Sequence, residues 1–220
     1  MTDTGNNKIR VAIFGGSGYG GSELLRILLF HPHVEIVLVT ANEHAGKAVS
    51  DVHRNLLGLT DLRFETAPED LSSIEVDAAF FALPHGQALS LMPQLRQNVK
   101  VVDLSGDFRI DDPDTFKKFY KLDSDVEVQE KFVYGLTENN RERIRSARYI
   151  ANPGCFATAT LLALSPMVKS GLLSGKVVVD AKTGSSGSGA KAAANTHHPQ
   201  RSNSFYAYKP FSHQHVPEIE

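Results

Sequence analysis

The chain has 220 residues, of which 41% are hydrophobic, and this supplies enough apolar material for one large or two small domains. The formal net charge of -2 at pH 7 argues against a nucleic-acid partner, since such proteins carry a basic face. One cysteine cannot form an internal disulfide, and we find no signal peptide and no apolar run long enough to span a bilayer. We therefore expect a cytoplasmic protein without membrane partners, although an organelle form with its transit peptide removed would look the same.

A dinucleotide-binding turn is predicted after a short, polar amino-terminal lead-in. Ile9 to Phe14 reads IRVAIF, which indicates a strand buried on both faces, and GGSGYGG follows it directly before a leucine-rich helix. In this context the glycines let backbone amides approach a pyrophosphate. The alternative is a tight strand-to-helix turn with no ligand. The predicted cofactor-binding residues of the turn are Gly15, Gly16, Ser17, Gly18, Tyr19 and Gly20.

The end of the second predicted strand, Val34 to Ala41, indicates which nicotinamide cofactor binds. NAD enzymes usually carry an Asp or Glu here for the ribose 2′-hydroxyl. This chain has Thr40 and Asn42 instead, with Lys47 soon after, and these groups suit a 2′-phosphate. We therefore predict NADP, bound in part by Thr40 and Asn42, while the nearby Glu43 favours NAD.

Further buried strands follow, with helical segments between them, and they favour a Rossmann-type, doubly wound parallel sheet over about 150 residues. These strands are predicted at Asp77 to Leu83, Val99 to Leu104 and Tyr149 to Asn152. A surface helix is predicted within Asp111 to Asp125, and a turn with a short amphipathic helix within Val133 to Arg145.

The loops after these strands lie where open α/β sheets bind ligands. Ser105 and Arg109 follow the strand that ends at Leu104, and we assign them to an anionic group of the substrate. An ion pair between Asp107 and Arg109 is an equally good interpretation. We expect His85 to cap the following helix or to face solvent, and not to act in catalysis.

Cys155 stands at the start of a predicted helix that runs to about Lys169. Asn152, Pro153 and Gly154 form a turn before it. A thiol at a helix start meets unpaired backbone N–H groups and the positive end of the helix dipole, which favours the nucleophilic thiolate. The alternative is that Cys155 is a small buried apolar residue.

A Gly/Ser-rich loop, Thr183 to Ala190, follows a strand predicted at Lys176 to Lys182. Its amides and hydroxyls, with two flanking ammonium groups, suit a phosphate better than a plain linker. We assign Ser186 and Gly187 to the cofactor, and Lys182, Ser185 and Lys191 to the phosphate of the substrate.

The last residues are predicted to form a strand at Phe205 to Lys209 and then a helix that Pro217 opens. His213 and His215 lie between these two elements and are two positions apart, so on a strand their side chains would face the same way. Two histidines without a third clear ligand make a metal site a weak alternative, and we predict no metal.

The motifs GSGYGG, LPHG, DLSGDFR, ANPGCF, TGSSGSGA and HQHVPEIE occur in this order, and the set resembles the N-acetyl-γ-glutamyl-phosphate reductase family. This family uses NADPH in arginine biosynthesis and is related to aspartate-semialdehyde and glyceraldehyde-phosphate dehydrogenases. The resemblance covers all 220 residues, and NPGC together with HQHVPEIE is specific. Phe156 and Ala157 stand where the family usually has tyrosine and proline.

The resemblance implies reduction of an acyl phosphate through a thioester. Cys155 falls on the acyl-accepting cysteine, and His215 or His213 on the acid/base histidine, of which we choose His215. Asn152 and backbone N–H groups near Cys155 are the candidates for stabilising the oxyanion. The product would be N-acetyl-glutamate 5-semialdehyde, made from N-acetyl-glutamyl 5-phosphate.

The resemblance also implies two domains and assembly. Residues 1–154 would form the NADP-binding domain, and residues 155–220 the first part of an α+β catalytic and dimerisation domain. Family members continue for roughly another hundred residues and associate as dimers or tetramers, so we expect a homo-oligomer for the full-length protein. Alone, this span is expected to expose an apolar face, to behave poorly in solution and to have little activity.

Two other functions stay open. The same chemistry would serve another acyl phosphate, namely aspartyl phosphate or a carrier-linked aminoadipyl phosphate. In that last case, Arg201 and Lys209 would meet an acidic carrier protein. A non-catalytic NADP-binding sensor, in which Cys155 is structural, is the alternative from a different class.

Overall fold

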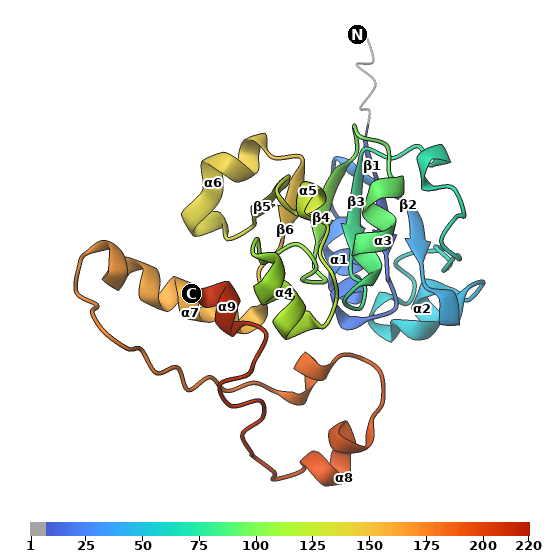
Figure 1. Cartoon of the computed structure of the whole chain (residues 1–220). Helices are drawn as coiled ribbons and strands as arrows, with labels where there is room; N and C mark the ends of the chain where they lie inside the picture. Colours follow the sequence, from blue (N-terminus) through green and yellow to red (C-terminus); the bar gives the residue numbers. More distant parts are fainter. Residues whose placement is uncertain (1–7) are drawn as a thin grey trace.

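A six-stranded parallel sheet forms the centre of the computed structural model, which describes residues 8–220 (Figure 1). The strand order is β2-β1-β3-β4-β6-β5, and every neighbouring pair is parallel. The predicted Rossmann-type sheet is therefore confirmed. The strands are β1 (Ile9–Phe14), β2 (Val34–Thr40), β3 (Ala78–Phe81), β4 (Lys100–Asp103), β5 (Phe132–Tyr134) and β6 (Tyr149–Ala151).

Each face of the sheet carries its own hydrophobic core. Ala12 and Phe14 of β1 pack into a cluster that includes Ala88 of α3, while Val11 and Ile13 pack with Leu25 of α1 on the other face. This alternation along one strand explains why β1 is apolar at successive positions. The α-helices are α1 (Tyr19–Leu28), α2 (Val49–Val52), α3 (Gln87–Leu91), α4 (Pro113–Tyr120), α5 (Val126–Gln129), α6 (Thr137–Ser146), α7 (Cys155–Lys169), α8 (His198–Arg201) and α9 (Val216–Ile219).

Five of the six strands match the sequence prediction to within two residues, as does the helix from Cys155 to Lys169. The strand β5 was not predicted, because we assigned Val133 onwards to a turn and helix. The predicted surface helix within Asp111 to Asp125 is confirmed as α4, and a further short helix, α5, follows directly after that range. The amino-terminal lead-in falls largely on residues 1–7, which lie outside the described residues.

Two strand predictions after α7 are wrong. Residues 176–182 and 205–209 contain no strand, and Val178 and Phe205 are 88% and 77% exposed. A strand needs a neighbour that takes up its N–H and C=O groups, and in residues 155–220 the structure provides none. In Figure 1 this part of the chain, in orange and red, extends away from the sheet and then returns, so that α9 lies beside α7.

The carboxyl edge of the sheet collects the loops that carry the predicted site. The glycine turn follows β1, Ser105 to Arg109 follow β4, and the NPG turn follows β6. In an open parallel sheet this edge is where ligands bind. Among the helices of residues 8–220, none is long and apolar enough to cross a membrane.

Candidate active site

Cys155 is the first residue of α7 and its side chain is exposed. The short strand β6 and the turn through Pro153 bring the chain to the helix start, and Gly154 is the N-cap. In the described part of the chain no side chain caps this helix end, so the backbone N–H groups of its first turn are left for the space around the thiol. The predicted placement of Cys155 is confirmed.

His215 lies directly against the residue that precedes Cys155. A Cβ built on Gly154 would overlap the imidazole of His215, at 2.5 Å from Cε1 and 2.8 Å from Cδ2. The ring is therefore packed on the Gly154 backbone, although 61 positions separate the two residues, and it is only 8% exposed. Burial, followed by the charges of His213 and Arg109, lowers the pKa of His215 to about 4. At neutral pH His215 is consequently uncharged.

His213 supports the turn that carries His215. Its Nδ1 accepts a hydrogen bond from the His215 backbone N–H at 3.1 Å, so Nε2 carries the ring hydrogen. That Nε2 faces the Tyr208 hydroxyl at 3.4 Å, and the rings of His213 and His215 lie 4.6 Å apart. The ring of Phe156, next to Cys155, packs against both histidines. His213 and His215 do lie together, but in a turn and not on a strand.

Glu218, which the sequence analysis did not single out, ties α9 to the turn before Cys155. Its Oε1 accepts hydrogen bonds from the Gly154 backbone N–H at 2.6 Å and from the Tyr134 hydroxyl at 2.8 Å. Its Oε2 lies 3.6 Å from Nη1 of Arg109, and both side chains are almost fully buried. Burial and the neighbouring Glu218 raise the pKa of Tyr134, which keeps its phenol protonated and donating. This network fixes the position of Gly154 and, through it, of Cys155.

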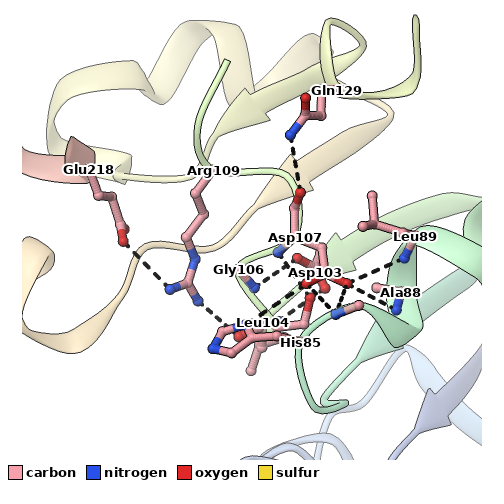
Figure 2. A network of polar contacts seen from close by, with 12 residues as sticks. His85, Ala88, Leu89, Asp103, Leu104, Gly106, Asp107, Arg109, Gln129 and Glu218 are labelled. Atoms are coloured by element: carbon pink, nitrogen blue, oxygen red, sulfur yellow. Dashed lines mark hydrogen bonds and ion pairs between the residues drawn. The ribbon is translucent and has the colours of Figure 1, made fainter. Parts of the chain in front are cut away.

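Arg109 does not pair with Asp107, so that interpretation of the sequence is wrong (Figure 2). Its Nη2 donates to the Leu104 carbonyl at 2.8 Å, and its Nη1 faces Glu218. Asp107 instead accepts from the backbone N–H groups of Gly86, Ala88 and Leu89 at the start of α3. Because Asp107 satisfies these amides, it takes the capping role that we expected of His85.

His85 lies at the edge of the same cluster. Its Nδ1 is 3.8 Å from Oδ1 of Asp107, and its ring packs on Tyr120 at a centroid distance of 4.9 Å. Burial lowers the pKa of His85 and raises that of Tyr120 to about 12. A Cβ on Gly106 would meet His85, Tyr120 and Arg109 within 3.3 Å, so these three side chains surround one point beside the β4 loop.

Ser105 belongs to a buried turn after β4. Its backbone N–H donates to Oδ1 of Asp103 at 3.0 Å, and its Oγ accepts from the Asp107 N–H at 3.2 Å. Burial raises the pKa of Asp103 to about 6. Asn152 is half-buried and its amide donates to the Pro153 carbonyl at 3.2 Å. Ser105 and Asn152 thus lie at the predicted edge, with part of their hydrogen bonding already used by the loops.

The glycine turn has the geometry that a dinucleotide needs. Gly15 has a φ of +83°, a conformation that favours glycine, and a Cβ on Gly16 would overlap Val39. A Cβ on Gly18 would meet nothing closer than 4.0 Å, so the outer side of the turn is open. Within residues 8–220 the backbone N–H groups of Ser17 and Gly18 donate to no protein acceptor. They are available to an anion at the start of α1.

The Gly/Ser loop reaches the same place. Tyr19 at the start of α1 and Ser185, Ser186 and Lys191 line one shallow cavity of about 240 Å³. The structure thus joins two motifs that are more than 160 positions apart in the chain. Gly187 lies within this loop, beside Thr183.

Other predicted binding residues lie elsewhere. Lys182 does not line this cavity but forms an ion pair with Asp180 at 2.6 Å, exposed to solvent. Thr40 is buried and its Oγ1 faces the Gly15 N–H at 3.4 Å, whereas Asn42 is exposed beyond the end of β2.

Comparison with known proteins identifies two adjoining regions. Residues 10–147 match the family described as semialdehyde dehydrogenase, NAD binding domain. Residues 155–220 match the family described as semialdehyde dehydrogenase, dimerisation domain. The first match covers the glycine turn and the strands β1 to β5 apart from Ile9, and the second begins at Cys155.

Individual relatives carry two kinds of name. The LysW-L-2-aminoadipate/LysW-L-glutamate phosphate reductase of Saccharolobus solfataricus is 46% identical over 97% of this chain and 62% of its own length. The N-acetyl-gamma-glutamyl-phosphate reductase of Methanococcus maripaludis is 42% identical over 95% of this chain and 61% of its own length. A crystal structure of aspartate semialdehyde dehydrogenase with NADP from Candida albicans is also similar, with a TM-score of 0.47 and 15% identity over 74% of this chain and 47% of that chain.

This chain therefore spans about 62% of the length of the curated relatives that it matches. The family match to residues 10–147 nevertheless covers more than half of the 220 residues, with β1 to β5 apart from Ile9, the glycine turn and the loop after β4 inside it. The chain belongs to the semialdehyde dehydrogenase family.

Proposed function

We propose that this chain carries the cofactor-binding and thiol-bearing part of an NADPH-dependent acyl-phosphate reductase. The observation that carries the proposal is the contact between the His215 imidazole and Gly154, the residue before Cys155. In the proposal, this contact brings His215, as an uncharged base, to the turn that leads into Cys155 at the start of α7. In this proposal residues 1–154 form the NADP-binding domain, and residues 155–220 the first part of the catalytic and dimerisation domain.

Cys155 would form a covalent bond to the substrate. Its sulfur attacks the acyl carbonyl carbon, the bond from that carbon to the phosphate oxygen breaks, and phosphate leaves with the electron pair. Cys155 then holds the acyl group as a thioester, so one difficult step becomes two easier ones. When the thioester has been reduced to the thiohemiacetal, the hydroxyl loses its proton, the carbon–sulfur bond breaks with its electron pair passing to sulfur, and the aldehyde leaves. The proton returns to the sulfur and regenerates the Cys155 thiol.

His215 would move the proton in these steps. It takes the thiol proton of Cys155 and returns it to the oxygen that becomes the hydroxyl of the thiohemiacetal. Its lowered pKa, of about 4, ensures that the ring starts without a charge. His213 would act through His215 by holding its backbone N–H. Backbone N–H groups at the start of α7, with Asn152 nearby, would stabilise the oxyanion.

The residues at the glycine turn fit a dinucleotide. The open side of Gly18, the amides of Ser17 and Gly18 that meet no acceptor in residues 8–220, and Ser186 in the adjoining cavity together suit a pyrophosphate. Ser185 and Lys191 of the same cavity stay assigned to the phosphate of the substrate. NADPH bound there would supply a hydride to the thioester carbon. Exposed Asn42 and the adjacent Lys47 favour the 2′-phosphate of NADP, while the buried Thr40 would act by holding the turn.

The preferred substrate is N-acetyl-glutamyl 5-phosphate, which is reduced to N-acetyl-glutamate 5-semialdehyde in arginine biosynthesis. The name of the Methanococcus maripaludis relative supports this substrate. The names of other relatives favour a second candidate, a carrier-linked aminoadipyl or glutamyl phosphate. Arg201 lies over the Tyr206 ring and Lys209 is exposed, and both would suit an acidic carrier.

Phosphate-dependent reduction of NADP by each semialdehyde separates these candidates. In a full-length protein that carries this chain, we expect turnover with N-acetyl-glutamate 5-semialdehyde. Turnover with only the carrier-linked semialdehyde would favour the second substrate, and turnover with only aspartate semialdehyde would favour aspartyl phosphate. A rate of Cys155 alkylation by iodoacetamide no faster than that of an ordinary thiol would instead favour the NADP-binding sensor. The match of residues 155–220 to a dimerisation domain supports a homo-oligomer.

A further inference from the structure

His53 is a buried side chain that the proposed reaction does not use. It lies between α2 and the turn at Arg54–Leu56, and it is 7% exposed. Its backbone N–H donates to the Val49 carbonyl at 2.8 Å, and its carbonyl accepts from the Leu56 N–H at 2.9 Å. These two hydrogen bonds fix the backbone from which the side chain projects. Its ring packs on Phe64 at a centroid distance of 5.9 Å.

The imidazole of His53 is directed at the glycine turn, 37 positions earlier in the chain. Its Nε2 lies 2.7 Å from the Gly16 carbonyl oxygen. A carbonyl only accepts hydrogen bonds, so Nε2 carries the ring hydrogen and donates it. Gly16 is held from its other side as well, because its N–H donates to the Thr40 carbonyl at 2.8 Å. Hydrogen bonds thus hold the backbone on both sides of Gly16, and the one from His53 fixes the orientation of the Gly16–Ser17 peptide group.

The orientation of this peptide group determines where the next amide points. Residues 8–220 contain no cis peptide bond, so the C=O of Gly16 and the N–H of Ser17 point in opposite directions. While His53 holds the carbonyl on the inner side of the turn, the Ser17 N–H faces the outer side. That side is open at Gly18, and the Ser17 N–H meets no protein acceptor in the described part of the chain.

We propose that His53 is a positioning residue for cofactor binding, which orients the Gly16–Ser17 peptide so that the Ser17 amide faces the pyrophosphate. The inference rests on the proposed function, since it needs a dinucleotide at the turn. His53 touches neither the cofactor nor the substrate in this role. It acts through the backbone of Gly16, and its effect appears in the affinity for the cofactor.

The test is equilibrium binding of NADPH, followed by its fluorescence, with the unchanged chain titrated first. His53→Phe keeps an aromatic ring on Phe64 but removes the donor, and we expect NADPH to bind about tenfold more weakly, as for one lost hydrogen bond in a buried site. His53→Gln retains a side-chain N–H donor and should recover most of the affinity. Val49→Ala is the matched control, because it removes buried packing beside the same histidine and leaves the Gly16 contact intact.

The variants separate positioning from general stability. We expect Val49→Ala to lower the melting temperature while NADPH affinity stays nearly unchanged. Equal weakening by Val49→Ala and His53→Phe, or His53→Gln binding as weakly as His53→Phe, would overturn the inference. If His53→Phe does not fold, NMR of the imidazole nitrogens in the unchanged chain decides. The Nε2 signal should be that of a protonated nitrogen and should shift on saturation with NADPH, and an unprotonated or unresponsive Nε2 would overturn it.

Failure of the proposed function and failure of the inference about His53 give different binding results. If the unchanged chain binds neither NADPH nor NADH, the proposed function and this inference are overturned together. If the unchanged chain binds NADPH and His53→Phe binds it equally well, only the inference about His53 is wrong.

Discussion

Replacement of Gly154 by alanine tests the contact on which the proposed function depends. The new Cβ would lie 2.5 Å from Cε1 and 2.8 Å from Cδ2 of His215. Carbon atoms in contact are about 3.5–4.0 Å apart, so the imidazole must move by about 1 Å. The backbone of Gly154 has a φ of -67° and a ψ of 154°, which alanine adopts without strain. Displacement of His215 is therefore the main consequence.

The expected cost follows from that displacement. A misplacement of about 1 Å in an active site reduces the rate by about 100-fold. This corresponds to about 2.7 kcal/mol of transition-state stabilisation. We expect kcat/KM of Gly154→Ala for the semialdehyde to fall by this factor, while the dissociation constant of NADPH and the melting temperature change little.

Steady-state kinetics with a matched control carry the test. Ala159→Ser also adds one heavy atom, but on the exposed side of α7, and should retain its activity. The reasoning is refuted if Gly154→Ala keeps full activity, or if its NADPH affinity falls as much as its rate.

Three more results are expected. Cys155→Ser should bind NADPH normally and lose turnover, and retention of most activity would exclude a covalent scheme. His215→Asn should reduce kcat more than His213→Asn, and the reverse order would exchange their roles. Burial lowers the pKa of His215 to about 4, against about 6.5 when unfolded, so the unfolded chain binds more protons between these values and stability rises with pH. The melting temperature of the unchanged chain, relative to that of His215→Asn, should therefore rise between about pH 4 and pH 6.5. A difference in melting temperature that does not change with pH would contradict the burial of this ring.

The sheet could be predicted because its strands are buried on both faces. IRVAIF and VEIVLVT are mostly apolar, with Arg10 and Glu35 as the second residue of each, and mostly apolar runs are typical of parallel strands. The strand β5 has only three residues at the edge of the sheet, too few to show a periodic pattern. The run KVVVDAK has the same composition as the true strands, but in this structure no strand lies beside it. Strand formation depends on such a neighbour, and the local sequence does not report it.

The candidate site was predictable where a local motif carries the chemistry. The glycine turn, the helix start at Cys155 and the paired histidines are of this kind. Glu218 was missed because its contacts with Tyr134 and Gly154 join residues 84 and 64 positions apart. An acidic residue near the end of a chain has no pattern that predicts burial. His53 was missed for the same reason, since its partner is a backbone carbonyl.

The central claim is that Cys155 accepts the acyl group, and mass spectrometry tests it most directly. Protein that carries this chain is mixed with the acyl phosphate in the absence of NADPH, quenched in acid and digested. We predict that the peptide with Cys155 gains the mass of the acyl group and loses it on addition of hydroxylamine, which cleaves thioesters. The account would be contradicted if the Cys155 peptide stays unmodified although the same mixture forms aldehyde when NADPH is added.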